Sequence, residues 1–203
     1  MATPHTPHLA GRLHLPRRTR TAGGRAAAVS TTAFRDAAVA GFRVVLGFVF
    51  LWAFLDKSFG LGYATRAGRG WVDGGSPTKG FLSHVDAGPM ASTLRGWAGE
   101  TWADWLFMAG LLGIGVALTL GIGLRIAAVS GTAMMALMWI AEWPPAKHTG
   151  EGTLTASTNP FADYHFVYAL ALVVLAAVAA GSRYGLGAWW ARQPLVRRYG
   201  WLR

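Results

Sequence analysis

Cysteine is absent from this chain of 203 residues. The chain can therefore form no disulfide, ligate no iron–sulfur cluster through thiolates and carry no cysteine persulfide. Any sulfur or electron chemistry must use another subunit or a bound cofactor. Phosphate-binding loops, nucleophile elbows and HExxH motifs are also missing from the sequence.

Paired histidines are lacking as well. Beyond the N-terminal region the histidines are His84, His148 and His165, and no two of them have the spacing of a metal or haem site. We therefore expect no haem, no iron–sulfur cluster and no metal ion in this protein.

Charged residues make up only 14% of the chain, whereas soluble domains carry roughly a quarter. Hydrophobic residues make up 53%, and the mean hydropathy is +0.33. The apolar residues form four runs of about the 20 residues that a transmembrane helix needs. These runs are residues 36–57, 102–121, 125–143 and 160–181. The sequence predicts an all-α integral membrane protein, an antiparallel up-down-up-down four-helix bundle with a long structured external loop between its first two helices.

Acidic residues are few and unevenly placed. Eight of the nine lie between Asp56 and Asp163, whereas arginines gather in the N-terminal 35 residues, at Arg125 and in residues 183–203. The positive-inside rule then places both termini in the cytoplasm of a multi-pass plasma-membrane protein. The net charge of +10 follows this topology, so we expect no nucleic-acid partner.

The two ends of the chain differ from its centre. Residues 1–35 lack an apolar face and predict a disordered, basic cytoplasmic tail. Residues 183–203 mix tryptophan with arginine and predict a cytoplasmic segment at the interface with anionic membrane lipid. Within the second span, Ala109, Gly113, Ala117 and Gly121 form a stripe of small residues that predicts close helix packing.

The first span carries ionisable residues at depths where they are costly unless they face a protein or aqueous interior. On a helix, one face holds Arg43, Gly47, Phe50, Phe54 and Lys57, with Arg43 and Lys57 about 21 Å apart along the axis. Such a face suits a flat ligand with polar oxygens and an apolar body. The alternatives are that Arg43 extends to the cytoplasmic headgroups and that Lys57 marks the external membrane boundary.

Polar and aromatic residues gather at the predicted external helix ends. They are Asp56, Lys57, Glu100, Asp104, Trp139, Glu142, Trp143, Asp163, Tyr164 and His165. Asp104 is typical of the start of the second helix. For the fourth helix the sequence predicts Asn159 as the cap, Pro160 as the first residue and Asp163 in the first turn. Glu142 opposes the helix dipole, which points to a function, and we expect it to meet Asp56 and Lys57. His165 is either a proton relay or a hydrogen-bonded interface residue.

Several of these segments resemble one known family. Arg43 to Gly47 and Phe54 to Lys57 resemble the first-helix signature of the DoxX family of four-helix membrane proteins. Residues 59–65, 74–78 and 142–145, with Asn159-Pro160, resemble its DoxD-type branch, which includes the membrane subunit of thiosulfate:quinone oxidoreductase. The resemblance covers residues 36–182 and implies a DoxX-like four-helix membrane domain engaged in membrane redox work.

The resemblance implies a quinone-interacting subunit of an oxidoreductase that passes electrons from thiosulfate or a related reductant to quinone. Arg43, Phe50, Phe54, Asp56 and Lys57 would bind the quinone, and Glu142 and His165 would move protons as the catalytic residues. A second oxidoreductase subunit or a homo-oligomer would complete the enzyme. The rival hypotheses are a non-catalytic membrane scaffold that recruits redox or stress-response partners and, third, a small-solute transporter.

Overall fold

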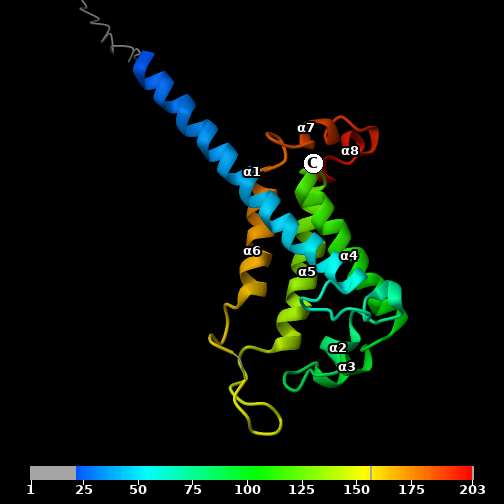
Figure 1. Cartoon of the computed structure of the whole chain (residues 1–203). Helices are drawn as coiled ribbons and strands as arrows, with labels where there is room; N and C mark the ends of the chain where they lie inside the picture. Colours follow the sequence, from blue (N-terminus) through cyan, green and yellow to red (C-terminus); the bar gives the residue numbers. More distant parts are fainter. Residues whose placement is uncertain (1–21, 156, 203) are drawn as a thin grey trace, which may run out of the picture. The chain divides into compact units, whose positions relative to one another are not determined.

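The computed structural model describes residues 22–155 and 157–202. Helices are the regular elements of these residues, apart from one isolated antiparallel bridge between His148 and Leu154 (Figure 1). In chain order they are α1 (Ala22–Phe59), η1 (Trp71–Asp73), α2 (Lys79–Leu82), α3 (Ala91–Gly96), α4 (Thr101–Leu120), α5 (Leu124–Glu142), α6 (Tyr164–Ala177), α7 (Gly187–Trp190), α8 (Pro194–Arg198) and η2 (Gly200–Leu202).

Within residues 22–155 and 157–202, three helices are long and apolar enough to cross a membrane: residues Thr31–Phe59 of α1, then α4 and α5. This finding agrees with the prediction of an all-helical membrane protein. The fourth predicted span, 160–181, contains the shorter apolar helix α6 of 14 residues. Its start is displaced because the Asn159 side chain forms a separate turn, accepting from Phe161 N and Ala162 N, while Asp163 caps α6.

The start of α1 also differs from the expectation. The helix begins at Ala22, so residues 22–35 of the tail expected to be disordered are helical, and residues 1–21 lie outside the described part. The chain divides into two compact units, 1–34 and 35–203.

Helix α1 packs against α4 through two glycines. A methyl group at Gly47 would lie 2.7 Å from Thr119 Oγ1, and one at Gly115 would lie 2.9 Å from the main-chain nitrogen of Leu51. Half of the predicted stripe lies away from this contact, because Ala109 and Gly113 are exposed. Helix α5 packs against both α4 and α6. The core of these helices includes Leu46, Phe50, Met108, Ile114, Leu118, Met135, Leu172 and Leu175.

The segment between α1 and α4 is folded. It contains η1, α2 and α3, and its Val85 and Leu94 form a small second core with Ala141 of α5. The buried carboxylate of Asp104 in α4 accepts hydrogen bonds from Ser76 Oγ at 2.9 Å and from the main-chain nitrogen and hydroxyl of Thr78 at 2.9 and 2.6 Å. The long loop is therefore structured, as predicted, and is fixed to the start of α4.

Residues 183–202 fold back onto the turn between α4 and α5. Val196 and Leu202 are buried, Trp190 Nε1 donates to Leu202 O at 2.8 Å, and Arg125 donates to Trp201 O at 3.4 Å. The side chains of Trp189 and Trp201 are exposed. These exposed rings are the feature that the predicted lipid-interface segment requires.

Candidate functional site

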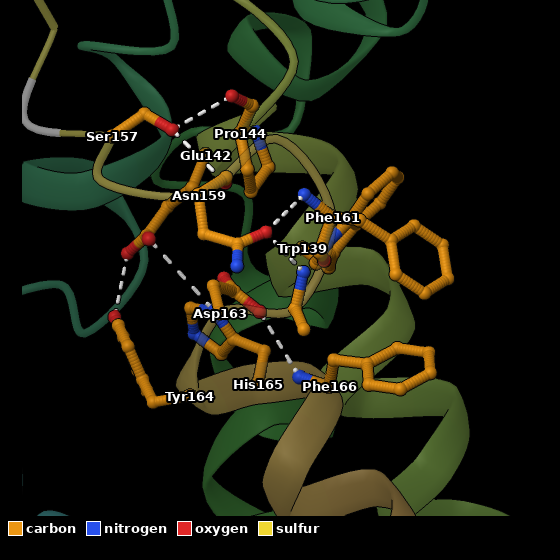
Figure 2. A network of polar contacts seen from close by, with 11 residues as sticks. Trp139, Glu142, Pro144, Ser157, Asn159, Phe161, Asp163, Tyr164, His165 and Phe166 are labelled. Carbon is orange, nitrogen blue, oxygen red and sulfur yellow. Dashed lines mark hydrogen bonds and ion pairs between the residues drawn. The ribbon is translucent and has the colours of Figure 1, made fainter.

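Four side chains that can carry protons meet where α5 ends and α6 begins (Figure 2). Tyr164 donates its hydroxyl to Glu142 Oε1 at 2.6 Å. His165 Nδ1 lies 2.9 Å from Asp163 Oδ2 and 3.8 Å from Glu142 Oε2. We call Glu142, Asp163, Tyr164 and His165 the α5–α6 polar cluster.

Local backbone structure brings these residues together. Helix α5 ends at Glu142 because Trp143 adopts a left-handed conformation, with φ 42°, and two prolines follow. The returning loop is tied to α5 by Ser157 Oγ, which donates to Pro144 O at 2.7 Å, and by Trp139 Nε1, which donates to Phe161 O at 2.8 Å. Asp163 then starts α6 by accepting from Phe166 N at 3.0 Å through Oδ1.

His165 is the most enclosed member of the cluster, with a relative exposure of 1%. His165 Nδ1 lies at hydrogen-bond distance from Asp163 Oδ2. An ionised carboxylate has no proton to donate, so Nδ1 is assigned as the donor in this contact. The other ring nitrogen, Nε2, is buried without a hydrogen-bond partner among the described residues. Buried polar atoms are rarely left in this state, so Nε2 is a candidate contact for a ligand or a water molecule.

Arg43 and Phe50 do face the protein interior, as the predicted helical face requires; Phe50 is a core residue and Phe54 packs against the core. Arg43 has a relative exposure of only 1%, so it does not extend to the headgroups. Its guanidinium donates to the main-chain oxygens of Leu118, of Thr119 at 3.0 Å and of Tyr184 at 2.8 Å. Arg43 thus joins α1 to the end of α4 and to the segment before α7.

Asp56 and Lys57 have partners outside the α5–α6 polar cluster. The buried Asp56 carboxylate accepts from Thr65 N at 2.8 Å and Tyr63 N at 3.2 Å, which orders the chain after α1. Lys57 Nζ lies 5.9 Å from the centre of the Phe107 ring, a cation–π contact. Within the described residues, no ion pair links either side chain to Glu142. Glu142 instead contacts Tyr164 and His165 of α6.

The structure adds two partners that the sequence did not assign. Asp163 was explained by its place at a helix start, and it performs that role with one oxygen while the other holds His165. Tyr164 was one of several aromatic residues at the predicted external end, and nothing in its spacing indicated Glu142. The sequence also gave no reason for metal binding, yet Glu142, Asp163 and His165 each offer a ligand atom within 4.8 Å of the others.

Comparisons with protein-family models, with curated proteins and with solved structures find no match for this chain.

Proposed function

We propose that this chain is a DoxX-like plasma-membrane subunit of a quinone-dependent oxidoreductase, with both termini in the cytoplasm. The α5–α6 polar cluster is the observation that carries the proposal. It joins an oriented imidazole with a free Nε2 to a tyrosine–glutamate pair. Groups in hydrogen-bond contact that accept and release protons are what quinone chemistry requires of a protein.

A quinone takes two electrons and two protons from its surroundings when it is reduced. In this proposal His165 accepts and delivers a proton at Nε2, Asp163 holds its ring in place, and Glu142 exchanges protons with the solvent. The Glu142 side chain is suited to that exchange because about a third of it, 34%, is exposed. The electrons come from a reductant, thiosulfate or a related compound, through a second subunit, because this chain has no cysteine for sulfur chemistry.

The first helix contributes less to the quinone site than the sequence suggests. The Arg43 guanidinium already donates to three main-chain oxygens, so we assign it to the fold. Lys57 Nζ forms no salt bridge or hydrogen bond among the described residues, and it lies beside the Phe107 ring. Lys57, with the half-buried Phe54, remains the part of the predicted set that is free to contact a ligand.

The test is to purify the protein in mild detergent and to measure bound quinone by mass spectrometry, followed by quinone reduction with the native reductant complex. We expect stoichiometric quinone in the wild type. Glu142→Gln removes the titrating group but keeps an acceptor for Tyr164, so turnover should fall about 100-fold with little change in melting temperature. Glu151→Gln changes an exposed acid of the nearby loop and should have no effect on turnover.

A non-catalytic scaffold is the second candidate, and one observation favours it. Arg43, Asp56 and Asp104 all interact with main-chain or loop groups of the protein itself, so the buried charges serve the fold. A stable partner that co-purifies without quinone would favour the scaffold. Lower stability of Glu142→Gln with unchanged turnover would do the same.

A further inference from the structure

Two carboxylates and one imidazole of the α5–α6 polar cluster converge on a common point. We propose that Glu142, Asp163 and His165 bind a divalent transition-metal cation such as Zn²⁺. An imidazole with two carboxylates is a common ligand set for first-row transition metals, and the nitrogen disfavours Mg²⁺ and Ca²⁺. The site uses residues of the proposed proton-exchange cluster, through Nδ1 of His165 and not Nε2, and it departs from the expectation from the sequence that the protein binds no metal ion.

The distances fit three ligands of one cation. Ligands about 2.1 Å from a tetrahedral zinc ion are about 3.4 Å from each other. His165 Nδ1 lies 2.9 Å from Asp163 Oδ2 and 3.8 Å from Glu142 Oε2, on either side of that value. All three ligand atoms lie within 4.8 Å of one another, so small side-chain rotations bring them to coordination distance.

The second oxygen of each carboxylate is already held in place. Tyr164 donates to Glu142 Oε1, and Phe166 N donates to Asp163 Oδ1. The other two carboxylate oxygens, Glu142 Oε2 and Asp163 Oδ2, are the ones that face His165 Nδ1. Outer hydrogen bonds of this kind orient the ligands of metal sites and are part of their affinity.

Charge and burial favour a cation independently of this geometry. His165 is buried, and Nδ1 faces both carboxylates. Among the described lysines and arginines, none forms an ion pair with Glu142 or Asp163. A singly charged imidazolium leaves one negative charge uncompensated, whereas a dication neutralises both carboxylates.

Binding of a cation at Nδ1 requires that nitrogen to give up its proton. A bound cation would therefore occupy the groups that exchange protons in the proposed function, and it would slow quinone reduction. That consequence rests on the proposed function, but the binding itself does not. A binding measurement without quinone consequently separates a failure of this site from a failure of the proposed activity.

The experiment is calorimetric titration of the full-length, Strep-tagged protein with Zn²⁺ in detergent. We expect one high-affinity equivalent in the wild type that Mg²⁺ does not displace. Glu142→Gln keeps the shape of the side chain, and it should weaken this equivalent by about tenfold or more. His165→Gln should weaken binding similarly. Glu151→Gln changes an exposed acid in the loop between α5 and α6, and it should leave binding unchanged. The three histidines before residue 15 are unchanged in every variant, so they contribute equally.

The outcomes separate clearly. Loss of one equivalent in Glu142→Gln, with a melting temperature like that of the wild type, supports the site. Equal stoichiometry and affinity in the wild type, Glu142→Gln and His165→Gln would show that Zn²⁺ binds elsewhere and would overturn the proposal. A wild-type protein without a high-affinity equivalent would overturn it as well.

Discussion

Arg43, Asp56 and Asp104 are nearly inaccessible to solvent. Arg43 and Asp104 contact segments that are distant in the sequence, whereas Asp56 contacts the chain that follows α1. A buried charge is stable only when hydrogen bonds replace the water that it loses. Arg43 obtains these bonds from main-chain oxygens, and the two acids obtain them from main-chain nitrogens and hydroxyls. The three side chains therefore determine where the connecting segments lie.

Substitution of Arg43 should test this structural role directly. Arg43→Leu leaves the oxygens of Leu118, Thr119 and Tyr184 without their donor, and we expect a loss of about 3 kcal/mol or more in unfolding free energy. Arg43→Lys should recover part of this loss, because an ammonium keeps the charge but cannot match the guanidinium geometry. The measurement is thermal or denaturant unfolding in one detergent.

Arg35→Leu is the matched control, because Arg35 lies on the same helix, is exposed and forms an ion pair with its neighbour Asp36. We expect less than about 1 kcal/mol for this exposed pair. Equal stability of Arg43→Leu and the wild type would contradict the assignment of Arg43 to the fold.

Depth and charge in the sequence identified Arg43, Glu142 and His165 as unusual residues, but they did not identify their partners. Those partners depend on how irregular segments return to the helices. Tyr164 reaches Glu142 only because residues 143–163 bring the start of α6 back to the end of α5. No periodic sequence pattern predicts such a return. For the same reason the contact between Arg43 and Tyr184 could not be predicted from the sequence.

Close contact between α1 and α4 depends on glycine at the point where the helices meet. The side chain and the main chain of Leu51 occupy the space that a methyl group at Gly115 would need. Gly113, two residues earlier on α4, has open space around the same position. Both glycines lie within α4, and they differ in whether a neighbouring helix occupies the space beside them, so they form a matched pair for substitution.

Gly115→Ala should therefore destabilise the protein by about 1–3 kcal/mol, because α1 must move away from α4. Gly113→Ala adds the same methyl group to the same helix, and it should be neutral or slightly stabilising because alanine favours helices. Unfolding of both variants in one detergent gives the comparison. Similar stabilities for the two variants would show that α1 and α4 do not meet at Gly115.

At the scale of helices, apolar run length predicted α4 and α5 to within about one residue. Run length worked there because Gly121 and the Trp143-Pro144-Pro145 sequence end both helices sharply. It was less accurate for α6, where Asn159 and Asp163 compete to cap the helix and the later residue does so. The stripe of small residues predicted close helix packing, yet its Ala109 and Gly113 are exposed, because such a stripe does not show which face of a helix is buried.

For the whole molecule, the distribution of arginine predicts a cytoplasmic C-terminus and external loops around Gly75 and Gly152. A reporter that is active only in the cytoplasm should work when fused after Arg203 and should be inactive when inserted at either glycine. An alkaline phosphatase reporter, which is active only outside, should show the reverse. The opposite pattern for both reporters would place the α5–α6 polar cluster on the cytoplasmic side.

The length of α6 has a consequence for the membrane around the protein. Its 14 residues give a helix of about 21 Å, whereas the hydrocarbon core of a bilayer is about 30 Å thick. If α6 completes a fourth crossing, the lipids beside it must thin locally, or the capping loop must lie below the headgroups. In either case acyl-chain length would set how much water reaches His165, so bilayer thickness would become a variable of the protein's chemistry.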